Sequence, residues 1–151
     1  MTYDSTDDTN KHIHQVRWQM KQVIEDLISR ATKHDRSKLE PPEKEIFDEY
    51  TPKLKASTYG SDEYKQFLVE MKPALDHHYA VNDHHPEHFF DGVWDMNLVQ
   101  IVEMLCDWKA ATMRHENGDL RKSIQINAER FGYPETFQTM LINTAEYFKW
   151  I

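Results

Sequence analysis

The sequence predicts an all-α protein, folded as a single-domain helical bundle of about five to seven helices. Glycine is scarce, with four residues in a chain of 151. No segment alternates apolar and polar residues at the two-residue period of a strand, whereas several repeat apolar residues at helical spacing. With 39% hydrophobic residues, the chain is long enough to bury one continuous core. We therefore expect one domain over residues 10–151, preceded by a polar, disordered segment over residues 1–9.

The first helix is expected over residues 10–33. Its apolar residues recur every three or four positions, which places them on one face of the helix. These residues are Ile13, Val16, Met20, Val23 and Leu27, together with either Ile24 or Ile28. An apolar stripe of this kind predicts a helix that packs against the core.

The rest of the chain divides into further helical segments, expected over residues 42–55, 62–81, 98–116, 120–131 and 135–150. Ser61, Asn97 and Asp119 each stand directly before one of these segments, where their side chains can cap a helix N-terminus. Pro73 is expected to kink or divide its segment, because proline interrupts helical hydrogen bonding. Gly132 suits a helix C-terminus.

Composition and charge exclude several classes of protein. Cys106 is the sole cysteine, so any metal must be held by histidine and carboxylate side chains, and a cytoplasmic setting is expected. The net charge of −8 opposes binding to long nucleic acid. No segment has the pattern of a secretory signal or a spanning helix, so no membrane association is expected. A small anionic substrate is compatible with this charge if a metal supplies local positive charge.

Several residues could hold such a metal. His34 and Asp35 are adjacent, and together they can offer one neutral nitrogen and one carboxylate to a cation. His12 shares a helical face with the apolar Val16. Asp107 lies within the apolar run "IVEMLCDW", where a buried carboxylate is costly without a partner. A hydrogen-bonded His-Asp network that holds helices together would satisfy the same atoms and is the structural alternative.

The segment "DHHYAVNDHHPEH", residues 76–88, contains five of the nine histidines. We expect one member of each histidine pair to be a metal ligand or substrate contact, and the other to bond backbone or carboxylate groups. The expected inward members are His78 and His85, with His84 as the next choice. Asp76 and Glu87 are the carboxylates expected to orient them.

Five other residues are candidates for binding substrate. Lys38 follows the His-Asp pair and could neutralise a phosphate oxygen. Ser123, Asn127 and Arg130 form one polar stripe along a predicted helix, and Arg130 could clamp a phosphate with two hydrogen bonds. Asn82 is expected to turn the chain between the histidine pairs and to lie at the substrate.

The order of these residues resembles the HD superfamily of metal-dependent phosphohydrolases. The matching features are "HIHQV", "HDRSK" and the late Asp107, and "HHPEHFFDG" is similar to the HHE…DG segment of its HD-GYP branch. A closer resemblance, over residues 12–144, is to an uncharacterised HD-like family common in bacteriophages and their bacterial hosts. It adds the pieces "HHYAVNDHHPEHF", "EMLCDW", "RKSIQINAERFG" and "INT". The resemblance implies an HD-like bundle in which His12, His34, Asp35 and Asp107 converge on one metal. The close spacing of the two histidine pairs departs from the pattern of two-metal HD enzymes and puts a second metal in doubt.

The chemistry expected from this site is hydrolysis of a phosphate ester by metal-activated water, with a nucleotide or other small phosphorylated metabolite as substrate. Asp35, Lys38, His78 and His85 would form the catalytic group. One or two divalent ions of Mn, Co, Zn, Ni or Fe would serve, because a histidine-rich site disfavours Mg. Two alternatives stay open. The first is a di-iron oxygenase, because some HD-fold proteins with a similar order of ligands hold two irons and oxidise C–H bonds with O2. The second is a non-catalytic phage-type protein that binds a nucleotide or host factor. The sequence does not determine the oligomeric state.

Overall fold

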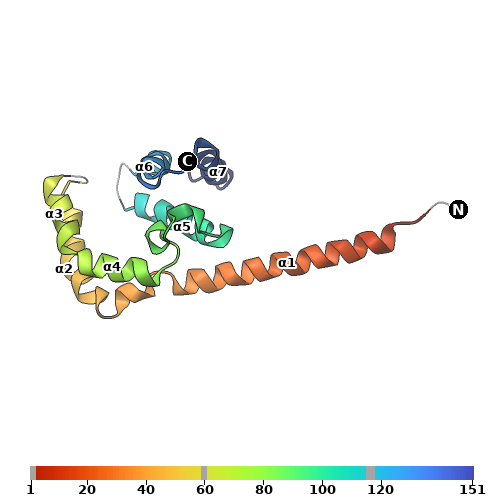
Figure 1. Ribbon diagram of the computed structural model, residues 1–151, viewed down its shortest axis with the longest axis horizontal. Coiled ribbons are helices and arrows are strands. Elements are labelled where there is room, and N and C mark those ends of the chain that lie inside the picture. Colours follow the sequence, from red (N-terminus) through yellow and green to blue (C-terminus); the bar gives the residue numbers. More distant parts are fainter. Residues whose placement is uncertain (1–2, 59–60, 115–117) are drawn as a thin grey trace. The chain divides into compact units, whose positions relative to one another are not determined.

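The computed structural model describes residues 3–58, 61–114 and 118–151. Every regular element within these ranges is a helix, which confirms the predicted all-α class (Figure 1). Seven α-helices and three short 3₁₀ helices are found in the described ranges. The chain divides into two compact units, residues 1–34 and residues 35–151, and the single domain over residues 10–151 stays a prediction.

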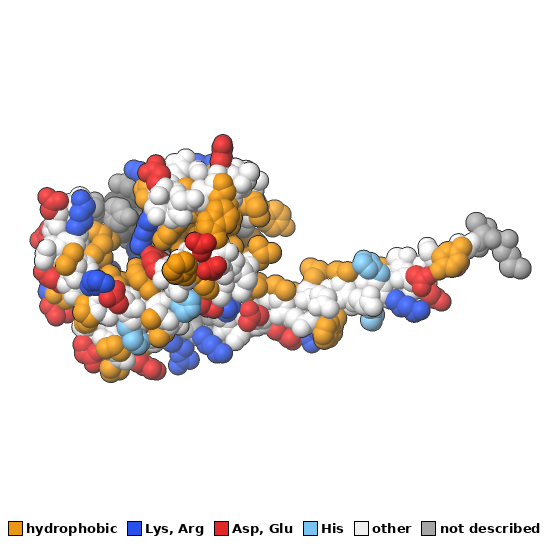
Figure 2. All heavy atoms as spheres, in the orientation of Figure 1, with side chains coloured by type: hydrophobic (Ala, Val, Ile, Leu, Met, Phe, Trp, Pro, Cys, Tyr) orange, Lys and Arg blue, Asp and Glu red, His pale blue; other side chains and the backbone are white. Residues whose placement is uncertain are grey.

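The first unit consists mainly of one long helix, α1 (Thr6–Lys33), which begins four residues before the predicted start at Asn10. Figure 1 shows α1 as one uninterrupted helix. The residues of the predicted apolar stripe lie along α1, and Figure 2 shows apolar side chains at intervals along this helix. α1 contains no buried residue, and Met20 is 59% exposed. The stripe is therefore mostly exposed along α1, and its packing against the core stays a prediction.

The second unit begins with the helices that carry the histidine-rich segment. Asp35 precedes the 3₁₀ helix η1 (Arg36–Leu39), and α2 (Glu43–Ala56) follows. The predicted helix over residues 62–81 is divided into α3 (Asp62–Glu70) and α4 (Lys72–Val81). Pro73 lies in the first turn of α4, where a backbone N–H has no partner within the helix, so its missing N–H costs no helical hydrogen bond. α2 packs against η1, α3 and α4, which brings the end of η1 beside the histidines of α4.

The main core lies among the last three α-helices. η2 (Pro86–His88) and η3 (Gly92–Trp94) lead into α5 (Leu98–Thr112), α6 (Leu120–Phe131) and α7 (Glu135–Tyr147). The expected cap residues are confirmed: Ser61, Asn97 and Asp119 each accept a backbone N–H, and Gly132 ends α6 with φ +67°. α5 ends at Thr112, before the predicted end near Asn117, which lies outside the described residues. The core side chains from these elements are Val93, Met96, Met104, Leu105, Trp108, Leu120, Ile124, Tyr133, Leu141 and Ala145.

Among the described residues, no helix is both long enough and apolar enough to cross a membrane.

Candidate metal centre

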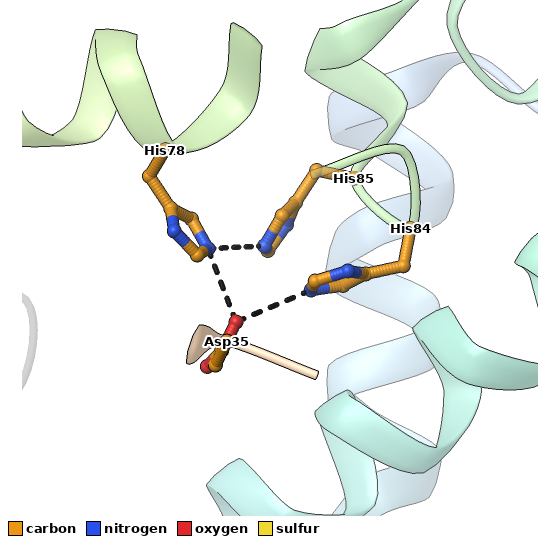
Figure 3. Close-up of side chains that lie close together, drawn as sticks. All are labelled: Asp35, His78, His84 and His85. Carbon is orange, nitrogen blue, oxygen red and sulfur yellow. Dashed lines mark hydrogen bonds and ion pairs between the residues drawn. The ribbon is translucent and has the colours of Figure 1, made fainter. Parts of the chain in front are cut away.

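Four side chains of the second unit converge on one point: Asp35, His78, His84 and His85. Figure 3 shows the three imidazoles pointing toward Asp35, His78 from α4 and the other two from the turn before η2. Each offers one ligand atom, and these four atoms lie within 4.8 Å of one another. His78 and His84 are buried, at 1% and 2% exposure, so this is an interior group rather than a surface cluster.

The separations within the group suit a common cation. His78 Nε2 lies 2.9 Å from His85 Nε2 and 3.2 Å from Asp35 Oδ1. His84 Nε2 lies 3.5 Å from the same Asp35 oxygen. Ligand atoms held at about 2.0–2.2 Å by one tetrahedral ion lie about 3.3–3.6 Å apart, close to the two distances from Asp35 Oδ1 and longer than the distance between the His78 and His85 nitrogens. Where two ring nitrogens, or a ring nitrogen and a carboxylate oxygen, face one another at these distances, a proton or a metal ion must lie between them.

His78 is held from behind by Glu43, the first residue of α2. Glu43 is fully buried, and its Oε2 lies 2.9 Å from His78 Nδ1 while its Oε1 lies 2.7 Å from His77 Nδ1. Ser37 Oγ donates to Glu43 Oε2 at 3.0 Å. Because a carboxylate only accepts hydrogen bonds, His78 Nδ1 donates to Glu43, and in the neutral ring the Nε2 lone pair is then directed into the group.

His84 has a similar partner on α5. His84 Nδ1 lies 3.4 Å from Glu103 Oε1, and both side chains are largely buried. A carboxylate behind one ring nitrogen again favours a free lone pair on the other, the arrangement that metal-binding histidines commonly show. Gln100, also on α5, donates to Asp83 at 2.7 Å and so ties the residue before His84 to the same helix.

Asp35 occupies an unusual backbone position. Its φ is +57°, in the left-handed region that aspartate tolerates better than most residues and that often marks functional positions. Burial alone would raise the pKa of its carboxyl, but contacts with His78 and His84 and the Lys38 ammonium lower that pKa well below its usual range. Lys38 Nζ lies 2.6 Å from Asp35 Oδ2, so the other oxygen, Oδ1, faces the histidines.

His85 completes the group as a neutral base. Desolvation by burial and repulsion from His84 and His78 lower its pKa to about 3. The Tyr79 ring packs edge-on against it, with centroids 5.0 Å apart. The neutral imidazole is the form that binds a metal ion.

The structure brings together only part of the predicted ligand set. Asp107 lies near Asp35, because one of its carboxylate oxygens is within 4.8 Å of an Asp35 oxygen, and its ligand role stays a prediction. His34 ends the first unit as the C-cap residue of α1, and its ligand role stays a prediction. His12 is exposed on α1, where roughly 30 Å of continuous helix separates it from His34. His12 and His34 therefore do not share an ion within one chain, contrary to what the resemblance implied.

The histidine pairs behave differently from one another. In the first pair, His78 points inward and His77 bonds a carboxylate, as predicted. In the second pair, both His84 and His85 belong to the group, although only one was expected to.

The orienting carboxylates differ from those predicted. Asp76 pairs with Lys72, and Glu87 pairs with Arg130. The carboxylates behind the histidines are Glu43, which sequence reasoning missed, and Glu103 on α5. Glu43 stands among charged residues at a helix start, where the sequence gives no sign of burial.

Of the predicted substrate residues, Lys38 and Asn82 contact members of the group. The Asn82 amide donates to Ser37 Oγ at 2.9 Å and to the His78 carbonyl at 2.8 Å, so both of its hydrogens already have acceptors inside the protein. Arg130 is about half exposed and pairs with Glu87, in the same 3₁₀ helix that follows His85. Ser123 and Asn127 are partly buried on α6, and their substrate roles stay predictions.

The fold and the site thus define an all-α protein with a buried group of histidines and an aspartate that could hold a metal ion. Residues 1–149 match a protein family described as "Family of unknown function (DUF5662)", and the chain belongs to that family. No curated protein matches the chain, and no solved structure matches it.

Proposed function

We propose that this protein binds a divalent transition-metal ion through Asp35, His78, His84 and His85 and hydrolyses a phosphate ester there. The observation that carries the proposal is the convergence of these four ligand atoms within 4.8 Å, three of them imidazole nitrogens. Three nitrogens and one oxygen suit Zn, Co, Mn, Ni or Fe better than Mg or Ca, which prefer oxygen ligands.

The protein's own groups would prepare this site in two ways. Glu43 and Glu103 fix the rings of His78 and His84, so that binding requires little rearrangement of the ligands. Asp107 lies close to Asp35 and adds a second carboxylate, which could help to hold a second ion. The proposed stoichiometry is therefore one or two ions.

A bound divalent ion would supply two things at this position, a lowered pKa for a coordinated water and positive charge opposite a phosphoryl group. Lys38 would add a second positive charge, because its ammonium already lies against the Asp35 carboxylate. Arg130 would offer a planar pair of donors to a phosphate, provided the anion displaced Glu87. The resemblance to HD phosphohydrolases supports the same reaction class, with a nucleotide or other small phosphorylated metabolite as substrate.

Elemental analysis of the purified protein, followed by a phosphoesterase assay with each metal, tests the proposal. We expect at least one bound transition metal per chain and turnover of a phosphate ester that EDTA abolishes. Stoichiometric nucleotide binding without turnover would point instead to a non-catalytic binding protein. A coloured iron-loaded protein that consumes O2 would point to the oxygenase alternative, and absence of any bound metal would refute the site itself.

A further inference from the structure

We infer that Glu43 is a positioning residue whose carboxylate sets the tautomer of His78 and thereby the metal affinity of the site. The effect on metal affinity rests on the proposed metal site, whereas the effect on the His78 tautomer can be measured in metal-free protein. Glu43 is fully buried and contacts both members of the first histidine pair through separate oxygens. A buried carboxylate is costly unless its oxygens are satisfied, and here three donors surround it.

Both ring nitrogens of His78 face a carboxylate, Nδ1 that of Glu43 at 2.9 Å and Nε2 that of Asp35 at 3.2 Å, and the shorter contact favours the proton on Nδ1. Three groups lie within hydrogen-bond distance of its Nδ1: the Glu43 carboxylate at 2.9 Å, the Asn82 amide nitrogen at 3.0 Å and the Ser37 hydroxyl at 3.2 Å. The Ser37 hydroxyl donates its one hydrogen to Glu43 Oε2 at 3.0 Å. The amide has two hydrogens, and the Ser37 hydroxyl and the His78 carbonyl accept both. The carboxylate has no hydrogen to give. His78 Nδ1 therefore donates to Glu43, and in the neutral ring Nε2 is left with its lone pair.

This assignment matters because His78 Nε2 is the atom that faces the rest of the group. It lies 3.2 Å from Asp35 Oδ1 and 2.9 Å from His85 Nε2. In the opposite tautomer, an N–H would point at these atoms and would have to be lost before a metal could bind. A carboxylate on the far nitrogen also raises the basicity of the ligating nitrogen. His77 secures the arrangement by holding the other Glu43 oxygen, which prevents the carboxylate from rotating away.

The sharpest test is Glu43→Gln in the full chain. Glutamine keeps the size of the side chain but has one oxygen acceptor instead of two. With that oxygen at His77 and the amide N–H at His78, His78 should switch to the Nε2–H tautomer. The matched control is Glu45→Gln, an exposed carboxylate two residues along on α2. Two measurements apply to each variant: the His78 tautomer from ring ¹⁵N chemical shifts in metal-free protein at about pH 8, and the Kd for Co²⁺ and Zn²⁺ by competition with a chromophoric chelator.

We expect the Nδ1–H tautomer at His78 in the wild type and in Glu45→Gln. Glu43→Gln should show the Nε2–H tautomer and bind metal about 10–100-fold more weakly, the usual effect of losing a partner behind a metal-binding histidine. Glu43→Asp, which keeps the charge on a shorter side chain, should recover part of the affinity. If Glu43→Gln does not fold, the His78 tautomer in the wild type and the metal affinity of Glu43→Asp still test the role of Glu43.

The outcomes separate this inference from the proposed function. A wild-type protein that binds neither metal would refute the metal site, while the tautomer of His78 would still report on Glu43. A wild-type protein with the Nε2–H tautomer would overturn the role of Glu43 directly. Metal binding in Glu43→Gln equal to that of the wild type would also overturn it and leave the metal site intact.

Discussion

At the scale of single residues, Asp35 is the ligand with the most connections in the candidate centre. Its Oδ1 faces His78 and His84, and its Oδ2 binds Lys38. Removing its charge should therefore disrupt the group without changing the shape of the side chain.

We predict that Asp35→Asn abolishes tight metal binding. Asparagine tolerates the left-handed backbone conformation of this position, so the variant should fold. The control is Asp76→Asn on α4, which removes an exposed partner of Lys72 worth about 0–1 kcal/mol. Bound metal per chain, measured by elemental analysis after loading, should fall to near zero only in Asp35→Asn. Full stoichiometry in that variant would mean that the carboxylate is not a ligand.

The histidines allow a second comparison at this scale. We predict that His78→Ala and His85→Ala lower phosphoesterase turnover at least about 10-fold, because each removes a nitrogen that faces the centre. His88→Ala should have little effect, since this exposed histidine bonds the Tyr79 carbonyl through Nδ1. Hydrolysis rate and melting temperature, measured together, separate loss of the site from loss of the fold. Equal small effects in all three variants would mean that His78 and His85 have no special role in turnover.

How far the sequence predicted the site depends on the residue. Asp35, His78 and His85 could be chosen because unusual residue types stand out in a sequence. Glu43 could not, because its burial comes from the packing of α2 on α4, between residues 35 positions apart. Charged residues at a helix start are ordinarily solvated, so only the fold distinguishes Glu43 from its exposed neighbour Glu45.

At the scale of helices, capping signals and breakers were predicted well because they act over a few residues. Asn97 forms a capping box with Gln100, and Pro73 marks the division between α3 and α4. The apolar stripe of α1 shows the limit of periodicity. It predicts that a helix forms and which face is apolar, but not what lies against that face, which is a property of tertiary structure.

The contact between α6 and α7 gives a prediction about pH. The buried Tyr133 hydroxyl donates to the Ile124 carbonyl at 2.6 Å, and its ring packs edge-on against Phe137. Burial raises the pKa of Tyr133, so the folded state retains a proton that the unfolded state loses above pH about 10. The stability that this residue contributes is therefore complete below pH 10 and declines as the pH rises further.

Tyr133→Phe tests this sign. We expect the variant to be about 0.5–1.5 kcal/mol less stable than the wild type at pH 7, because one buried hydrogen bond is lost. The difference in the free energy of unfolding between the two proteins should shrink between pH 10 and pH 11. In this range only the wild type must keep Tyr133 protonated in order to stay folded. Urea denaturation of both proteins at these pH values measures it. A difference that stays constant across the range would contradict the raised pKa.

At the scale of the whole molecule, the candidate centre joins segments that the chain keeps far apart. Asp35 precedes η1, His78 lies on α4, and His84 and His85 lie in the turn before η2, while Glu103 reaches the group from α5. A metal bound there would connect these segments within the second unit. A ligand that binds the folded state but not the unfolded state stabilises it by an amount set by its concentration relative to Kd.

We therefore predict that bound metal raises the urea concentration at which the second unit unfolds. At a free metal concentration 100 times Kd, the free energy of unfolding should rise by about 2.7 kcal/mol over that of the EDTA-treated protein. Trp18 is the tryptophan of the first unit, so a Trp18→Phe background makes tryptophan fluorescence report on residues 35–151 alone. Asp35→Asn in the same background should unfold at the same urea concentration with and without metal. A shift of equal size in that variant would show that the ion binds elsewhere on the protein, and no shift in either would show that the four side chains hold no metal.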